Sequence, residues 1–109
     1  MAKALDGIKI LEFGRFIAVP SCTLLFVNLG AEVIKVEIPG SGDATRTNPP
    51  MTEGKEAYLF MALNRGKKSI TLNLGTARGP EIAKELVKRV DIVVENLRNG
   101  AMDSLGLGY

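Results

Sequence analysis

The chain has 109 residues, of which 46% are hydrophobic and 24% charged, as expected for one soluble globular domain. Its net charge of +2 is small and its Lys and Arg residues are scattered, which argues against a nucleic-acid partner. No stretch reaches the roughly 18 apolar residues of a membrane span, and no signal-peptide core follows Lys3. Cys22 is the only cysteine, so no intrachain disulfide can form, and we expect a cytoplasmic protein without a membrane partner. The absence of His removes the commonest transition-metal ligand, and no metal site is predicted.

The first half of the chain predicts a strand, a helix and a second strand. Residues 8–13 form the first strand, and residues 20–29 form a helix that ends at Gly30, a suitable residue for the left-handed position after a helix. This helix is apolar nearly all round, which predicts burial on more than one side, against a partner chain or a further part of the protein. A β-branched strand over residues 32–37 is followed by a long polar loop, residues 38–52, of a length that is often functional or mobile.

The second half continues the alternation of helices and strands. We expect a short helix over residues 56–64 and a strand over 68–74, in which Ile70, Leu72 and Leu74 share one face. An amphipathic helix then begins at Thr76 or Gly79 and continues to about residue 90. A fully buried strand over 91–95 and a helical turn over 101–105 follow. The alternation predicts an α/β fold with a mostly parallel sheet. Because no long helix follows the last strand, residues 1–109 are expected to be the N-terminal segment of a larger protein.

Loops at the carboxyl ends of parallel strands are the first place to look for a ligand. A dinucleotide site would need G-x-G-x-x-G after the first strand, with an acidic residue such as Glu37 for the ribose. The turn reads G-R-F-I-A-V-P and supplies one glycine where three are needed, so a nicotinamide or flavin cofactor is disfavoured. No Walker A pattern occurs either.

Three glutamates, Glu12, Glu37 and Glu95, lie at or near strand carboxyl ends. The favoured interpretation is that they cap backbone N–H groups or pair with Arg15 or Arg98, rather than act as a catalytic set. No nucleophile with an activating partner is recognisable.

Three other features have a structural interpretation and a functional one. Asp43 is favoured as a turn or N-cap residue, and Cys22 as a buried structural thiol. The cluster Arg65-Gly66-Lys67-Lys68 is either a phosphate-binding loop or a solvated run of charges.

Five motif blocks, in order, cover nearly the whole chain. They are L-D-G-I-K-I-L-E-F, P-x-C-T, L-G-A-E-V-I-K-V-E-x-P-G-x-G-D-x-T-R, N-R-G-K-K-S-I-T-L-N-L and D-I-V-V-E-N-L-R-N-G-A-M-D-S-L-G-L-G-Y. Together they resemble the N-terminal part of the family III CoA-transferases, the CaiB/BaiF type. This family includes formyl-CoA transferase, carnitine CoA-transferases and α-methylacyl-CoA racemase.

The resemblance implies a Rossmann-like, coenzyme A-binding segment of an interlocked homodimer, with acyl-CoA and a carboxylic acid as substrates. In the transferases an Asp carboxylate attacks the acyl-CoA and forms a mixed anhydride and then an aspartyl-CoA thioester. That Asp is expected beyond residue 109, so the 109-residue chain should be inactive alone. Two alternatives stay open: an acyl-CoA racemase of the same fold, and a truncated, non-catalytic module that binds CoA or a partner.

The resemblance also implies which residues contact CoA. Nine positions match the family's strand exits: Ile17, Ala18, Leu72, Asn73, Leu74, Gly75, Asn96, Leu97 and Arg98. Other positions depart from the family pattern. Ile38 replaces an Arg that lies beside the nucleotide, so that Arg46 or Lys35 would have to substitute for it. Gly75 and Ser104 replace a Lys and an Arg of other members.

Overall fold

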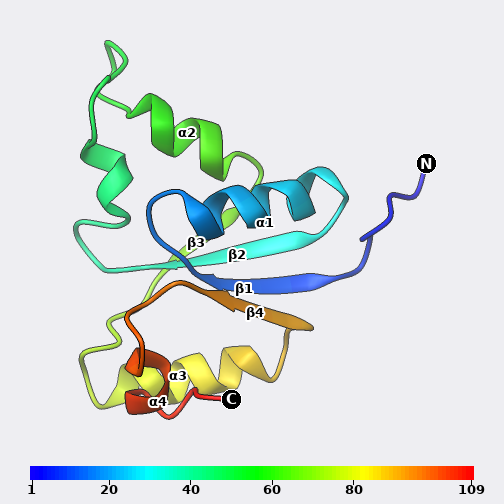
Figure 1. Cartoon of the computed structure of the whole chain (residues 1–109), viewed down its shortest axis with the longest axis vertical. Helices are drawn as coiled ribbons and strands as arrows, with labels where there is room; N and C mark the ends of the chain where they lie inside the picture. Colours follow the sequence, from blue (N-terminus) through cyan, green and yellow to red (C-terminus); the bar gives the residue numbers. More distant parts are fainter.

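The computed structural model describes all 109 residues and contains one four-stranded sheet. The strands are β1 (Lys9–Phe13), β2 (Glu32–Glu37), β3 (Lys68–Thr71) and β4 (Ile92–Glu95). They lie in the order β3-β2-β1-β4, and every neighbouring pair is parallel. The predicted α/β fold with a parallel sheet is therefore confirmed (Figure 1).

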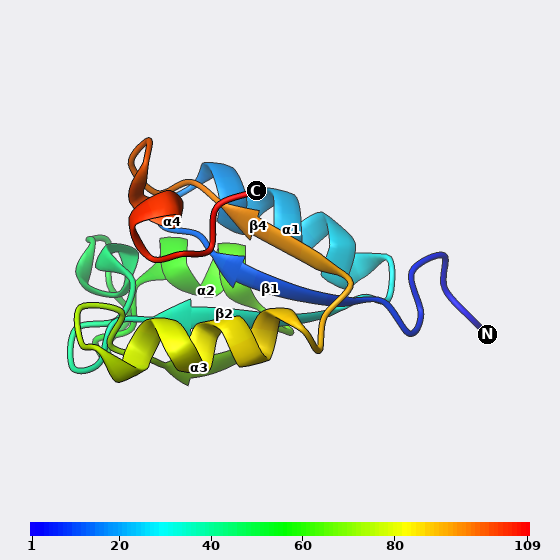
Figure 2. The same ribbon diagram turned by 90° about the horizontal axis from the view of Figure 1, so that it is seen from below.

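Helices cover both faces of this sheet. Helices α1 (Ala18–Asn28) and α2 (Tyr58–Asn64) lie on one face, while α3 (Arg78–Val87) and the short α4 (Ala101–Ser104) lie on the other (Figures 1 and 2). The loop after β2 contains one 3₁₀ turn, η1 (Ala44–Thr47). No helix is long and apolar enough to cross a bilayer.

The alternation of side chains along the strands separates two small cores. On the α1 face, Ile10, Ala31 and Val33 are buried together. On the α3 face, the buried residues are Leu11, Phe13, Val36 and Ala83, and Ile70 of β3 packs against them together with Leu72 and Leu74 of the exit that follows this strand. The shared face predicted for those three residues is confirmed, although the strand expected over residues 68–74 ends at Thr71.

The strand order places a topological switch point between β1 and β4. The chain leaves β1 toward β2 on one side of the sheet, and β4 pairs with β1 on the other side. In open α/β sheets, ligands bind in the crevice outside the strand carboxyl ends at such a point. The turn after β1 and the loop after β4 border that crevice.

Two expectations about burial need correction. Strand β4 is not fully buried: it forms an edge of the sheet, and Ile92 is 41% exposed. Cys22 is only partly buried. Helix α1 buries Val19, Pro20 and Thr23, while Leu25 is 62% exposed, so within this chain the apolar helix is covered on one side only.

Candidate functional site

A cavity of about 120 Å³ opens at the carboxyl edge of the sheet. Its apolar lining comes from all four strands or their exits, and its polar lining from Glu37 at the end of β2 and from the loops that follow the strands. The lining residues are Phe13, Arg15, Val36, Glu37, Ile38, Gly42, Leu72, Asn73, Leu74, Gly75 and Leu97. Most of the apolar members belong to or pack against the core on the α3 face, so the sheet itself fixes the walls.

The structure brings together five of the nine residues that the sequence indicates as ligand contacts. The β3 exit, residues 72–75, and Leu97 line the cavity. Ile17 and Ala18 lie instead at the start of α1, where both are exposed. Asn96 and Arg98 flank Leu97 on the exposed β4 exit without lining the cavity. Asn96 nevertheless reaches the site indirectly, because its side chain hydrogen-bonds the backbone of Arg15.

The exit of β3 is held in place by the start of α3. The Thr76 hydroxyl accepts a hydrogen bond from the Gly79 N–H at 3.1 Å, as expected for a residue that caps this helix. Gly79 is buried against the Asn73 carbonyl, where any Cβ atom would collide with the backbone. Close contact between helix and loop therefore fixes one wall of the cavity.

Glu37 carries the one acidic side chain in the cavity lining, and both of its oxygens are occupied. Arg46 donates from Nε and Nη2 at 2.8 and 2.7 Å, the Asp43 N–H donates at 2.9 Å, and the Ser69 hydroxyl donates as well. Burial alone would raise the pKa of the Glu37 carboxyl, but the hydrogen bonds from Arg46 and Ser69 outweigh it and lower the pKa to about 2. Glu37 is thus a fixed anion.

A second polar cluster lies behind the cavity, on the α1 face of the sheet. Glu12 and Lys35 are opposite each other in the parallel register, and their side chains form an ion pair at 2.8 Å. The other Glu12 oxygen contacts Lys67 Nζ at 2.9 Å and accepts from the Thr23 hydroxyl at 2.6 Å. All of these side chains are almost fully buried.

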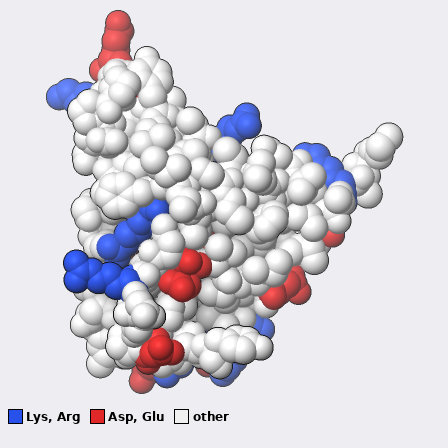
Figure 3. Space-filling model, viewed as in Figure 1, with Lys and Arg blue, Asp and Glu red and all other residues white.

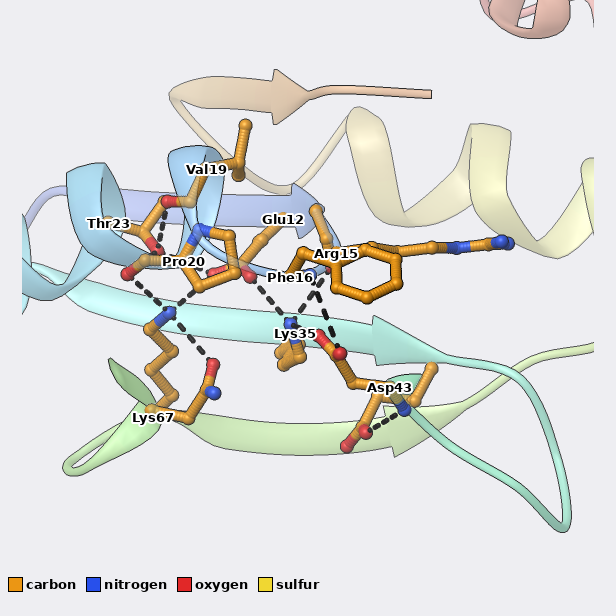
Figure 4. Close-up of polar contacts among 12 residues, drawn as sticks. Glu12, Arg15, Phe16, Val19, Pro20, Thr23, Lys35, Asp43 and Lys67 are labelled. Atoms are coloured by element: carbon orange, nitrogen blue, oxygen red, sulfur yellow. Dashed lines mark hydrogen bonds and ion pairs between the residues drawn. The ribbon is translucent and has the colours of Figure 1, made fainter. Parts of the chain in front are cut away.

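Asp43 completes this cluster from the loop after β2. One carboxylate oxygen lies 2.9 Å from Lys35 Nζ (Figure 4). The other caps η1 through the N–H and hydroxyl of Thr45. The predicted capping role of Asp43 is confirmed. Burial alone would raise the pKa of Asp43. The hydrogen bonds from Lys35 and Thr45 outweigh this effect, so the pKa of Asp43 is lowered. Two carboxylates and two ammonium groups leave the cluster neutral.

These contacts correct several sequence-based interpretations. Glu12 pairs with Lys35 and Lys67 rather than with Arg15, and Glu37 pairs with Arg46. Only Glu95 acts purely as a backbone cap, by accepting from the Leu97 N–H at 2.8 Å.

The expected substitute cations are also engaged elsewhere. Lys35 is buried and cannot reach a ligand, while Arg46 is held by Glu37 and stacks 3.8 Å from the centre of the Phe60 ring. Of the Arg65–Lys68 cluster, Arg65 is exposed and Lys68 forms a surface pair with Glu32, as expected for a solvated run, whereas Lys67 is buried against Glu12.

The free cations near the cavity are carried by the exits of β1 and β4. Arg15 and Arg98 are exposed and form no ion pair. In the space-filling view, a patch of Lys and Arg atoms lies on the side of the molecule where the strands end, and other Lys and Arg atoms are spread over the rest of this face (Figure 3). The site therefore combines apolar walls with a cationic rim, an arrangement suited to a ligand with a planar ring and anionic groups.

Comparison with known proteins decides the family. A family model described as CoA-transferase family III matches residues 5–109. The chain belongs to this family. The resemblance inferred from the motif blocks is thus confirmed.

Relatives within the family III CoA-transferases share this segment closely. Human succinyl-CoA:glutarate CoA-transferase is 47% identical over 98% of this chain and 24% of its own length. Succinyl-CoA:mesaconate CoA-transferase of Haloarcula marismortui is 46% identical over 97% of this chain and 28% of its own. A CAIB/BAIF family protein from Brucella suis has a solved structure that matches all of this chain and 30% of its own, with a TM-score of 0.90 and 43% identity. The chain spans about a quarter of the length of the curated relatives it matches.

Proposed function

We propose that this chain is the coenzyme A-binding, N-terminal part of a CoA-transferase, an enzyme that moves CoA from an acyl-CoA thioester to a carboxylic acid. The observation that carries the proposal is the convergence of residues 72–75 and Leu97 on one cavity at the switch point of the sheet. Family membership, together with relatives named as CoA-transferases, supports the reaction class.

The chemistry of the cavity suits the nucleotide end of CoA. The apolar side chains of Leu72, Leu74 and Leu97 can enclose a planar adenine, while Asn73 offers an amide to its ring nitrogens. Arg15 and Arg98 supply exposed guanidinium groups at the rim, which suit the phosphates of CoA because guanidinium binds phosphate oxygens in pairs. Ile17 and Ala18 would then face the thioester end.

Transfer itself needs a nucleophilic carboxylate. In the proposed reaction that carboxylate attacks the thioester carbonyl and expels CoA thiolate, which leaves a mixed anhydride. The thiolate then attacks the carbonyl carbon that the anhydride derives from the enzyme carboxylate, and the donor acid leaves. The resulting aspartyl-CoA thioester passes CoA to the acceptor acid by the reverse steps.

The acids next to the cavity are poorly suited to be that nucleophile. Glu37 accepts four hydrogen bonds, Asp43 is buried against Lys35 and Thr45, and the pKa of each carboxyl is lowered, so neither carboxylate is free to attack a ligand. The burial of Asp43 and the four hydrogen bonds on Glu37 support an Asp beyond residue 109 as the nucleophile, and we expect the 109-residue chain to bind CoA without transferring it.

The exposed apolar side of α1 supports the proposed homodimer. Leu25 and Leu29 are 62% and 47% exposed, on a helix that is apolar nearly all round. Such a surface favours burial against another chain or another part of the same protein.

The test is titration of the chain with coenzyme A by isothermal calorimetry. We expect saturable binding that weakens at least fivefold in Arg15→Ala and in Arg98→Ala. Arg65→Ala is the matched control, because Arg65 is exposed but lies at the opposite end of β3, and it should bind as the unmodified chain does. Absence of binding, or an equal loss in all three variants, would contradict the proposal.

A further inference from the structure

The turn that follows β1 adopts an unusual backbone conformation. Phe16 has a φ of 60°, in the left-handed region that residues with bulky side chains rarely adopt. Its side chain is 56% exposed, so burial of the ring does not explain the conformation. Strained residues persist only where the surrounding structure determines them, and they cluster at functional sites. The question is therefore what holds this turn.

Three side chains from three different elements bond the backbone of the turn. Lys35 Nζ, from β2, donates to the Gly14 carbonyl at 2.9 Å. The amide of Asn96, from the β4 exit, bonds both the N–H and the carbonyl of Arg15. The Asp43 carboxylate accepts from the Phe16 N–H at 3.5 Å, the outer limit of a hydrogen bond. Consecutive residues of the turn are thus each tied to a different part of the fold. Figure 4 shows Lys35 and Asp43 beside Arg15 and Phe16.

Lys35 is the residue that links these ties to the core. Its ammonium group contacts Glu12 at 2.8 Å, the Gly14 carbonyl at 2.9 Å and Asp43 at 2.9 Å, and its side chain is 1% exposed. Through Asp43 it also fixes the carboxylate that faces Phe16. Because a buried ammonium group is tolerated only with its partners in place, the contacts form and break together.

We propose that Lys35 is a positioning residue for the candidate site. It holds the turn over residues 14–16 in the conformation that directs Arg15 to the cavity, without touching the ligand itself. This proposal rests on the proposed function, because the position of the turn matters for a ligand only if the cavity binds CoA. The observation that carries the proposal is the hydrogen bond from the buried Lys35 to the Gly14 carbonyl, two residues before Phe16, whose backbone is in the left-handed region.

Lys67 provides a matched control within the same cluster. It too is a buried lysine that contacts Glu12, at 2.9 Å, but its other bonds reach the Pro20 carbonyl and Asn64 and none reaches the turn. Lys35→Met and Lys67→Met therefore remove the same charge from the same carboxylate. Both should lower the melting temperature, and only the first should release the turn.

The experiment compares the two variants in the 109-residue chain by two measurements. The first is amide hydrogen exchange at Arg15, whose N–H is bonded to Asn96. We expect at least tenfold faster exchange in Lys35→Met than in Lys67→Met, after correction for global stability. The second is calorimetric titration with coenzyme A. Here we expect at least tenfold weaker binding in Lys35→Met, and less than threefold in Lys67→Met.

The outcomes separate the two proposals. The exchange measurement needs no ligand, so if the unmodified chain does not bind CoA, the proposed function fails while the positioning role is still tested. Equal exchange at Arg15 in both variants, or an equal loss of CoA affinity, overturns the positioning role. If Lys35→Met does not fold, Lys35→Arg keeps the charge beside Glu12 but alters the bond to the Gly14 carbonyl, and it is compared with Lys67→Arg in the same two measurements.

Discussion

The side-chain amide of Asn96 pairs with both backbone polar groups of Arg15. Its Oδ1 accepts from the Arg15 N–H at 2.9 Å, and its Nδ2 donates to the Arg15 carbonyl at 3.0 Å. The pair joins the exits of β1 and β4, which are distant in sequence but adjacent in the sheet. Asn96 therefore connects the two strand exits at the switch point in the way that a backbone hydrogen-bond pair connects two strands, although it does not line the cavity.

Replacement of Asn96 by Ala should loosen this connection. Two lost hydrogen bonds at an exposed position correspond to about 1–2 kcal/mol of unfolding free energy, which lowers the melting temperature by several degrees in a domain of this size. Coenzyme A affinity should fall as well, because Arg15 loses its fixed position. Asn99→Ala is the control: Asn99 is exposed and its side chain has no hydrogen-bond partner. Equal melting temperatures for the two variants, measured by circular dichroism, would contradict the role.

Removal of the Glu12 charge should be far more destabilising. Glu12→Gln leaves two buried ammonium groups facing Asp43 as the one remaining carboxylate of the cluster. Breaking a buried ion pair from one side costs about 3–5 kcal/mol, and urea denaturation should show a loss of that size. Glu85→Gln breaks an exposed, solvent-screened pair with Lys88 and should leave the urea midpoint nearly unchanged.

A double variant sharpens this second test. Glu12→Gln combined with Lys67→Met restores neutrality, since Lys35 and Asp43 then remain as a pair. It should be more stable than Glu12→Gln alone. If the double variant is less stable by the sum of the two single losses, charge balance is not what holds the cluster.

A methyl group at Gly79 should displace the β3 exit, which forms one wall of the cavity. Gly79→Ala places a Cβ atom against the Asn73 carbonyl, and backbone at this contact can move only if the β3 exit moves with it. We expect a loss of about 1–3 kcal/mol from overpacking, together with weaker coenzyme A binding. Gly54→Ala is the control, because the nearest atom to its Cβ would be the Thr52 hydroxyl at 3.7 Å. Unchanged NMR shifts of residues 73–75 in Gly79→Ala would count against this role.

The order of elements and their apolar faces could be predicted from sequence because they depend on local periodicity. The face shared by Ile70, Leu72 and Leu74 and the stripe on α3 are examples. Partial exposure of β4 was not predictable in this way, because a run of apolar residues gives no information about whether a strand lies at an edge of the sheet.

The buried charges depend on register, which the sequence does not reveal directly. Glu12 and Lys35 meet because β1 and β2 align them as partners on the α1 face. Lys67 lies in a run of basic residues that is typical of a solvated loop, yet it is buried against Glu12. One signal was available: Glu12 and Lys35 interrupt apolar strands at central positions, where an unpaired charge would be too costly.

The ionisation of Glu37 should make the unfolding free energy of the chain depend on pH in the acid range. Its pKa of about 2 in the folded chain lies below the ordinary value of 4.5, so the unfolded state binds the proton more tightly. The stabilisation from this group is complete above about pH 4.5 and is lost as the pH falls from there to about 2. Because Arg46 is 41% exposed, solvent screens its pair with Glu37, and the stabilisation from this group is at most on the order of 2–3 kcal/mol.

Comparison with Glu37→Gln isolates this contribution from that of Asp43, whose pKa is also lowered. The difference in unfolding free energy between the unmodified chain and Glu37→Gln should be largest at pH 6 and should shrink steadily toward pH 2.5, in urea titrations at each pH. Glu53 is exposed and has no ion pair, so the unfolding free energy of Glu53→Gln should change with pH in the same way as that of the unmodified chain. A difference that stays constant with pH would show that Arg46 and Ser69 do not hold Glu37 as an anion, because only a group whose folded pKa lies below its unfolded value produces this slope.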